Sequence, residues 1–195
     1  MIIARIVGAY LRFKSRWFEQ HPAINICQHL AQARKVLIYM PRKVEQFGAA
    51  LKSLERLRKL RPAWRITVIN KMEMVNFIDT KLKVEILPYS SDDINFAGMP
   101  KAQIKQLIQK SEFDLALDLT LKFDLFVIAL FNLSSAPIKV CFENSEKSPF
   151  HNVEIRVNPA ESLTNKYNAM VKYINMIAGA VEPRDSLRET SPGIK

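Results

Sequence analysis

The sequence is poor in cysteine and glycine and contains no long apolar run. Its 195 residues include 2 Cys and 5 Gly. Cys27 and Cys141 lie far apart, and neither belongs to a CxxC pair. A disulfide scaffold is therefore excluded, and two free thiols in a reduced, cytoplasmic protein are predicted. The apolar stretches are shorter than the roughly 18 residues that a membrane-spanning helix needs. The start of the chain also lacks the basic region of a signal peptide.

Acidic residues are scarce in the first third of the chain. The formal net charge is +10, and residues 1–72 hold 15 basic and 3 acidic side chains, whereas residues 73–195 hold 14 and 16. Such asymmetry predicts a polyanionic partner, which is a nucleic acid, an anionic lipid or a phosphorylated substrate.

Residues 1–18 are typical of an amphipathic helix, which together with a linker forms an N-terminal segment, 1–33. Arg5, Arg12 and Arg16 share one face of this helix, next to aromatic side chains such as Trp17. This pattern predicts peripheral contact with an anionic membrane, at the inner face of a bacterial envelope. The alternative is a helix that packs on the domain with its arginines in water.

The rest of the chain alternates apolar runs with helical patterns. Continuous or β-branched runs predict strands at 35–40, 65–70, 83–88, 113–119, 138–142 and 153–157. Helical spacing predicts helices at 44–60, 100–110 and 123–133, and a last one that starts with Asn158 as cap and Pro159 in the first turn. Pro22 and the polar stretch around Asn25 and Gln28 break the helical pattern, and the chain from there to residue 33 is interpreted as the linker. This order predicts the α/β class: one Rossmann-like domain, 34–180, with a mainly parallel sheet and helices on both faces. The polar tail, 181–195, is predicted to be disordered.

In such sheets ligands bind beyond the carboxyl ends of the strands, which nominates the loops at 41–46, 70–72, 119–122 and 143–147. Arg42 and Lys43 are candidates for gripping an anionic ligand, and Glu45 for a carboxylate base. The alternative is a charged loop in water.

A second group of candidates follows the strand at 113–119. Asp118, Thr120 and Lys122 are candidate ligand-binding residues, although capping of the next helix and turn formation are the favoured roles of Asp118. His151 is interpreted as structural because a single histidine does not make a site.

The motifs of several cofactor sites and catalytic sites are absent. Residues 40–48 contain one glycine, Gly48, where the GxGxxG fingerprint requires three, and the P-loop, GxSxG and HExxH patterns do not occur. Neither a cofactor nor a metal is predicted.

Residues 35–70 nevertheless resemble the opening of the heptosyltransferase-like glycosyltransferases of family 9, which have the GT-B architecture. The resemblance rests on the strand at 36–39, the helix segment Leu54–Pro62 and the strand at 65–68. It continues through Phe113–Leu121, which is similar to the family's "YDLVIDLQG" segment, and through Ser135–Phe142, which is similar to "GAPVRIGF". It covers about residues 35–180.

The departures from the family concern catalysis. The resemblance implies an aspartate in the first turn that acts as base for the acceptor hydroxyl, but this position is Gln46, and a carboxylate occurs only one residue earlier, at Glu45. The family's donor-binding domain would have to follow residue 180, where 15 residues remain.

Three functional hypotheses follow. The first is a degenerate half of a glycosyltransferase that binds an anionic glycan or lipid-linked acceptor as an accessory module in envelope glycan synthesis of the lipopolysaccharide type. The second is an active glycosyltransferase completed by a donor domain on a partner chain. The third is a basic nucleic-acid-binding module, which is disfavoured because no nucleic-acid-binding motif occurs.

Overall fold

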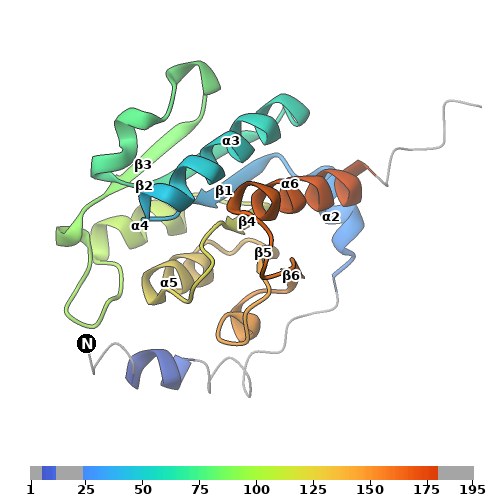
Figure 1. Cartoon of the computed structure of the whole chain (residues 1–195). Helices are drawn as coiled ribbons and strands as arrows, with labels where there is room; N and C mark the ends of the chain where they lie inside the picture. Colours follow the sequence, from blue (N-terminus) through green and yellow to red (C-terminus); the bar gives the residue numbers. More distant parts are fainter. Residues whose placement is uncertain (1–5, 12–23, 180–195) are drawn as a thin grey trace, which may run out of the picture.

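The computed structural model describes residues 6–11 and 24–179, and its centre is a single parallel sheet. Six strands are arranged in the order β3-β2-β1-β4-β5-β6, and every neighbouring pair is parallel (Figure 1). The strands are β1 Lys35–Tyr39, β2 Arg65–Lys71, β3 Glu85–Tyr89, β4 Leu115–Asp118, β5 Ile138–Phe142 and β6 Val153–Ile155. The predicted α/β class and Rossmann-like fold are confirmed, with β1 and β4 at the centre as their unbroken apolar character indicated.

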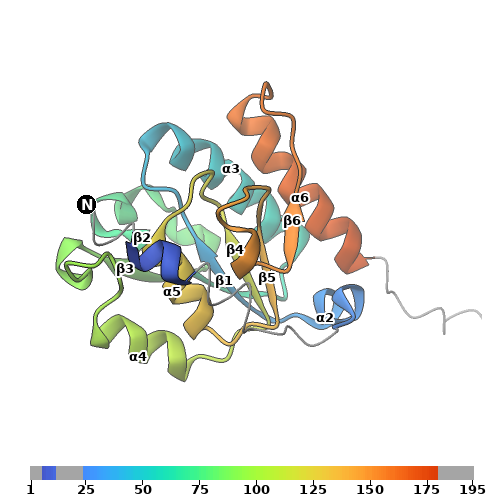
Figure 2. The same ribbon diagram turned by 90° about the horizontal axis from the view of Figure 1, so that it is seen from below.

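Helices cover both faces of the sheet. One face packs against α2 (Ile26–Gln32), α3 (Val44–Leu60) and α6 (Leu163–Gly179), and the other against α4 (Ala102–Lys110) and α5 (Leu125–Leu133). Helices α3 and α6 lie side by side on their face (Figures 1 and 2). Short 3-10 helices occupy Met72–Phe77, Thr80–Leu82, Ser91–Asp93 and Ser148–Phe150.

The side chains of β1 alternate between the two layers, as the pleat of a strand requires. Val36 and Ile38 belong to the core beneath α3 and α6, whereas Leu37 and Tyr39 belong to the core beneath α4 and α5. All four are completely buried. Burial on both faces explains why the strand is apolar at consecutive positions.

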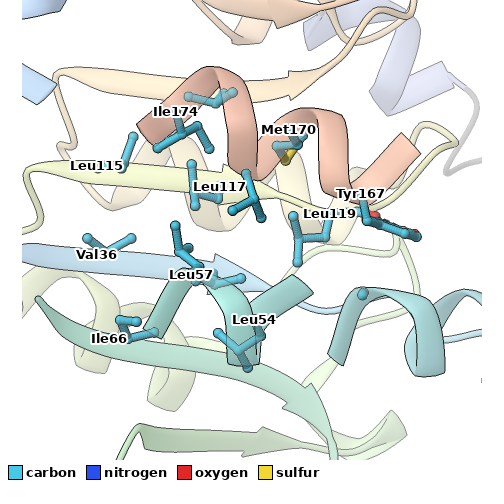
Figure 3. Packing of buried hydrophobic residues seen from close by; sticks show 14 of the residues in the cluster. Val36, Leu54, Leu57, Ile66, Leu115, Leu117, Leu119, Tyr167, Met170 and Ile174 are labelled. Carbon is cyan, nitrogen blue, oxygen red and sulfur yellow. Dashed lines mark hydrogen bonds between the residues drawn. The ribbon is translucent and has the colours of Figure 1, made fainter. Parts of the chain in front are cut away.

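Figure 3 shows how α3 and α6 contribute to the first of these cores. Leu54 and Leu57 of α3 and Met170 and Ile174 of α6 point toward the sheet, and each is at most 3% exposed. Full burial of one such side chain contributes about 1.5–3 kcal/mol to the free energy of folding. The helical spacing of these residues therefore determines which face of each helix meets the sheet.

Three expected helix starts differ from the structure, and one helix was not expected. The helix predicted at 123–133 begins at Leu125, after its cap Asp124. The helix predicted from Pro100 begins at Ala102, because Pro100 forms an antiparallel bridge with Ile94. The last helix begins at Leu163, because the Ser162 hydroxyl accepts from the Asn165 amide while Asn158 closes a separate turn with Ala160. The segment interpreted as a linker contains α2, which Asn25 caps by accepting from the Gln28 amide.

The two outer strands differ from the central ones. Strand β3 contains Pro88 and is only partly buried, and β6 has three residues. They close the sheet on its two sides.

The N-terminal segment is described only in part. Residues 6–11 are helical, and Leu11 lines a hollow of about 230 Å³ together with Ala129 and Leu133 of α5. The remainder of the helix predicted at 1–18, and the tail predicted from 181, lie outside the described residues. Within residues 6–11 and 24–179, every helix is too short or too polar to cross a membrane.

Candidate functional site

The strand order reverses between β1 and β4, and their carboxyl ends define the candidate site. In open parallel sheets the crevice at such a switch point is where ligands bind. The loop at 40–43 follows β1, and the loop at 119–124 follows β4. The Leu119 amide donates to the Tyr39 carbonyl at 3.1 Å, which joins the chain at the ends of β1 and β4.

Arg42 forms a clasp at the ends of these strands. Its Nε lies 2.9 Å from the Tyr39 hydroxyl and 2.8 Å from the Tyr89 hydroxyl, and its Nη2 lies 3.1 Å from the Asp124 carboxylate. The guanidinium also lies over the rings of Tyr89 and Phe126. The clasp thus joins β1, β3 and the start of α5, and it leaves 36% of the Arg42 side chain exposed.

The electrostatics of the clasp favour neutral phenols. The two tyrosine hydroxyls hydrogen-bond to each other, and burial raises the pKa of Tyr39 well above its ordinary value and raises that of Tyr89 as well. Burial also raises the pKa of Asp124, while the positive charge of Arg42 opposes the shift. Neither phenol is therefore a proton acceptor near neutral pH.

Asp118 lies in a second, sealed cluster at the end of β4. One carboxylate oxygen accepts from the amide and the hydroxyl of Thr120, at 2.8 and 2.7 Å. The other oxygen lies 2.8 Å from Lys147 Nζ, which also donates to the Thr120 hydroxyl at 2.8 Å. Asp118 and Lys147 are both completely buried, so the carboxylate does not reach the crevice.

His151 adjoins the sealed cluster. Its Nδ1 lies 3.1 Å from the Lys147 carbonyl, and its Nε2 lies 3.8 Å from the Asp118 carboxylate. Burial lowers the pKa of His151, although the Asp118 carboxylate opposes the shift. The imidazole is therefore neutral near neutral pH, and its Nδ1 contact with the Lys147 carbonyl lies within the loop after β5.

The comparisons with known proteins fit this architecture. The model of a protein family described as "Family of unknown function (DUF6913)" matches residues 28–177. The chain belongs to this family. No curated protein matches the chain in sequence.

Two solved structures of one glycosyltransferase are similar in fold. E. coli heptosyltransferase WaaC with ADP aligns at a TM-score of 0.57 and 11% identity, over 71% of this chain and 46% of that chain. The same enzyme with ADP-2-deoxy-2-fluoro heptose aligns at a TM-score of 0.56 and 12% identity, over 71% and 47%. A family 9 glycosyl transferase from Veillonella parvula DSM 2008 has a TM-score of 0.49 and 13% identity, over 75% and 41%. The chain thus spans less than half the length of each of these proteins. The expected resemblance to the heptosyltransferase fold is confirmed, and identity this low shows the fold alone.

The candidate residues that follow β1 differ in their burial and in their contacts. Arg42 enters the clasp, whereas Lys43 and Glu45 are exposed at the start of α3, and Gln46 is half-buried one residue further. Glu45 lies in the first turn of α3, where a negative charge also favours the helix dipole.

The predicted residues after β4 divide in the same way. Asp118 and Thr120 form the sealed cluster, and Lys122 is exposed. Asp118 makes the expected turn with Thr120, but the expectation that it caps the next helix is wrong: Asp124 caps α5 by accepting from the Phe126 amide. Asp118 instead ends β4, six positions before that cap.

Four residues of the two clusters were not predicted. Asp124 carries a recognisable signal, because an aspartate just before an apolar run is typical of a helix cap. Tyr39, Tyr89 and Lys147 carry no such signal, because their roles depend on partners that the fold brings together. The residues proposed for a membrane surface, Arg5, Arg12, Arg16 and Trp17, lie outside the described residues, so that contact stays a prediction.

Proposed function

We propose that this domain binds an anionic glycan at the crevice between the loops after β1 and β4, and that it does not by itself transfer sugar. The domain would serve as an accessory module in envelope glycan synthesis of the lipopolysaccharide type. The observation that carries the proposal is the state of the crevice carboxylates. Asp118 is held by Lys147, and Asp124 is held by Arg42 and by the start of α5.

Binding is supported by the cations on both sides of the crevice. Lys43 is exposed on the loop after β1, and Lys122 on the loop after β4. Arg42 lies between these loops, with part of its side chain exposed. An anionic acceptor needs only complementary charge and hydrogen-bond donors, which these side chains supply. The heptosyltransferase-like fold makes a glycan the preferred class of anion.

The domain by itself lacks a well-placed base for sugar transfer. Glycosyl transfer needs a base for the acceptor hydroxyl, a site for the donor diphosphate and exclusion of water between them. Tyr39 and Tyr89 are neutral phenols near neutral pH, and Asp118 is sealed. The remaining carboxylate near this site is the exposed Glu45, in the first turn of α3. It lies one residue before the position that the family resemblance assigns to the base. The competing proposal is that Glu45 acts as base once a partner chain supplies a donor domain.

Binding is tested with a purified, phosphorylated core oligosaccharide, by calorimetric titration of the full chain. The double variant Lys43→Ala/Lys122→Ala is expected to bind several-fold more weakly. The matched control is Lys81→Ala/Lys110→Ala, which removes two exposed cations that lie outside these loops and should bind like the wild type. Equal weakening in both double variants would show that only net charge matters and would overturn the proposed site.

Catalysis is tested by incubating the chain with the same acceptor and a panel of sugar nucleotides, with the product read by mass. We expect no transfer. Glu45→Gln should retain binding, or improve it, because one like charge is removed from the site of an anion. Turnover that Glu45→Gln abolishes would replace the binding proposal by the catalytic one.

A further inference from the structure

A second cationic site lies away from the crevice, in a hollow between α3, α6 and the loop after β6. Its volume is about 370 Å³, and four cations line it: Arg56 from α3, Arg156 from the loop, and Lys166 and Lys172 from α6. Figure 2 shows α3 and α6 side by side, with the chain from β6 to α6 beside them. The hollow shares no residue with the loops at 40–43 and 119–124.

The positive charge of this hollow is not balanced within its walls. The one carboxylate in the wall, Glu161, accepts from the side-chain Nδ2 of Asn165 at 2.7 Å. Arg156 is paired with Glu143, which lies outside the wall. Three of the four cations belong to residues 73–195, which carry 14 basic and 16 acidic side chains. This part of the chain has no excess of positive charge, so its composition does not explain why three of its cations line one hollow. Like charges at close range repel, and an anion between them would offset this cost.

Two of the four cations, Arg56 and Lys172, are available to a ligand, whereas Arg156 is engaged by Glu143. Arg56 makes a long contact of 3.4 Å with the Asn168 side chain, and both Arg56 and Lys172 are exposed. Lys166 Nζ donates to the Pro159 carbonyl at 2.7 Å. The planar guanidinium groups match the geometry of phosphate oxygens, and ammonium groups add charge.

We infer that this hollow binds the phosphoryl groups of a phosphorylated small molecule. The volume suits a ligand of that size. A single-stranded nucleic acid would require a longer basic track with several exposed aromatic rings, whereas the wall contains one, Tyr173. The inference is independent of the proposed function, because it involves none of the crevice residues.

The first test uses inorganic pyrophosphate as the probe, titrated into the full chain at low and at moderate salt. We expect saturable binding that weakens with salt, and Arg56→Gln/Lys172→Gln should reduce the affinity at least tenfold. Lys81→Gln/Lys110→Gln removes the same charge elsewhere and should not change the affinity. Arg56→Gln/Lys172→Gln should cause the same loss of pyrophosphate affinity in the background of Lys43→Ala/Lys122→Ala, so failure of this inference is distinguishable from failure of the proposed function.

A gain in affinity provides the second test. Glu143→Gln removes the carboxylate that pairs with Arg156, so the guanidinium becomes free for the anion, and pyrophosphate should bind several-fold more tightly. This variant keeps every cation of the hollow.

The chemical source of the phosphoryl group is tested by competition. Displacement of pyrophosphate by a hexose phosphate would support a small-molecule ligand. Displacement only by vesicles that contain phosphatidic acid, or only by an oligonucleotide, would overturn it. Absence of pyrophosphate binding at low salt would overturn the site itself. Equal losses of affinity in Arg56→Gln/Lys172→Gln and in the control Lys81→Gln/Lys110→Gln would overturn it as well.

Discussion

Two pairs of a cation with a carboxylate stand at the carboxyl ends of the central strands, and they differ in their access to water. The side chains of Lys147 and Asp118 are 0% and 1% exposed, whereas those of Arg42 and Asp124 are 36% and 22% exposed. The first pair holds the loop after β5 against β4. The Thr120 hydroxyl donates to Asp118 and accepts from Lys147, so both charged groups make a further hydrogen bond. The second lies in the crevice and shares its cation with two phenols.

The difference separates a structural role from a binding role. Moving two charges out of water costs more than their attraction returns unless further hydrogen bonds are made, so a sealed pair tolerates no loss of a partner. A half-exposed pair contributes little to stability, because water and salt screen it. We therefore propose the binding role for Arg42 and the structural role for Lys147. Four experiments break or sharpen this comparison.

The largest effect is expected from Lys147→Met. The substitution leaves Asp118 buried without its cation, which should lower the free energy of unfolding by about 3–5 kcal/mol. Urea denaturation followed by circular dichroism measures the change. The double variant Lys147→Met/Asp118→Leu removes both charges and should recover much of the loss. A single variant as stable as the wild type would show that the sealed pair does not hold this loop.

The pH dependence of stability reports on His151. Its pKa is lowered by burial, against the pull of the Asp118 carboxylate and with smaller contributions from Lys147 and Lys139. Below about pH 6.5 the unfolded chain therefore binds a proton that the folded chain does not. As the pH is lowered through this range, the free energy of unfolding should decrease by up to about 1.4 kcal/mol per pH unit. His151→Gln should flatten this part of the stability profile. The control is His29→Gln on α2, and a slope that His151→Gln leaves unchanged would contradict the assignment.

Asp124 combines a helix cap with the exposed pair, and two variants separate these roles. Asp124→Asn retains a capping side chain and loses the charge, whereas Asp124→Ala loses both. We expect the alanine variant to be less stable than the asparagine variant by about 1 kcal/mol, the usual contribution of a cap. Urea midpoints of the two proteins decide this. Equal midpoints would mean that the pair with Arg42, and not the cap, carries the contribution.

The smallest effect on stability is expected for a third pair, Arg156 with Glu143. Both side chains lie on the surface, at 83% and 42% exposure, so Arg156→Ala should leave the thermal midpoint unchanged in calorimetry. The same variant should weaken pyrophosphate binding, because Arg156 lines the hollow beside α6. A clear loss of stability would place this arginine among the structural residues.

The sequence predicted most of the fold because the central strands are buried on both sides. Unbroken apolar runs locate β1 and β4, and helical spacing locates α3 with its observed boundaries. The prediction of helices failed where the sequence signal for a helix was weak, or where two residues could equally cap its start. Helix α2 has seven residues and only one buried side chain, Leu30, and the start of α6 offered two capable caps, Asn158 and Ser162.

The candidate site was predicted only in its locally encoded part. Position at a strand end identified Arg42 and Asp118, but their partners come from distant segments: Tyr89 lies 47 positions from Arg42, and Lys147 lies 27 positions from Thr120. Whether a charged residue is sealed or exposed depends on such partners. The sequence could therefore name the charges at this edge without distinguishing the pair that stabilises the fold from the cations that face solvent.

The two outer strands have a consequence for the behaviour of the protein at high concentration. An exposed strand edge is a template on which another chain can add its own strand, which leads to aggregation. Here β3 contains Pro88, which has no amide hydrogen to offer, and β6 presents only three residues. Both edges are therefore poor templates, so the sheet resists lengthening by intermolecular pairing.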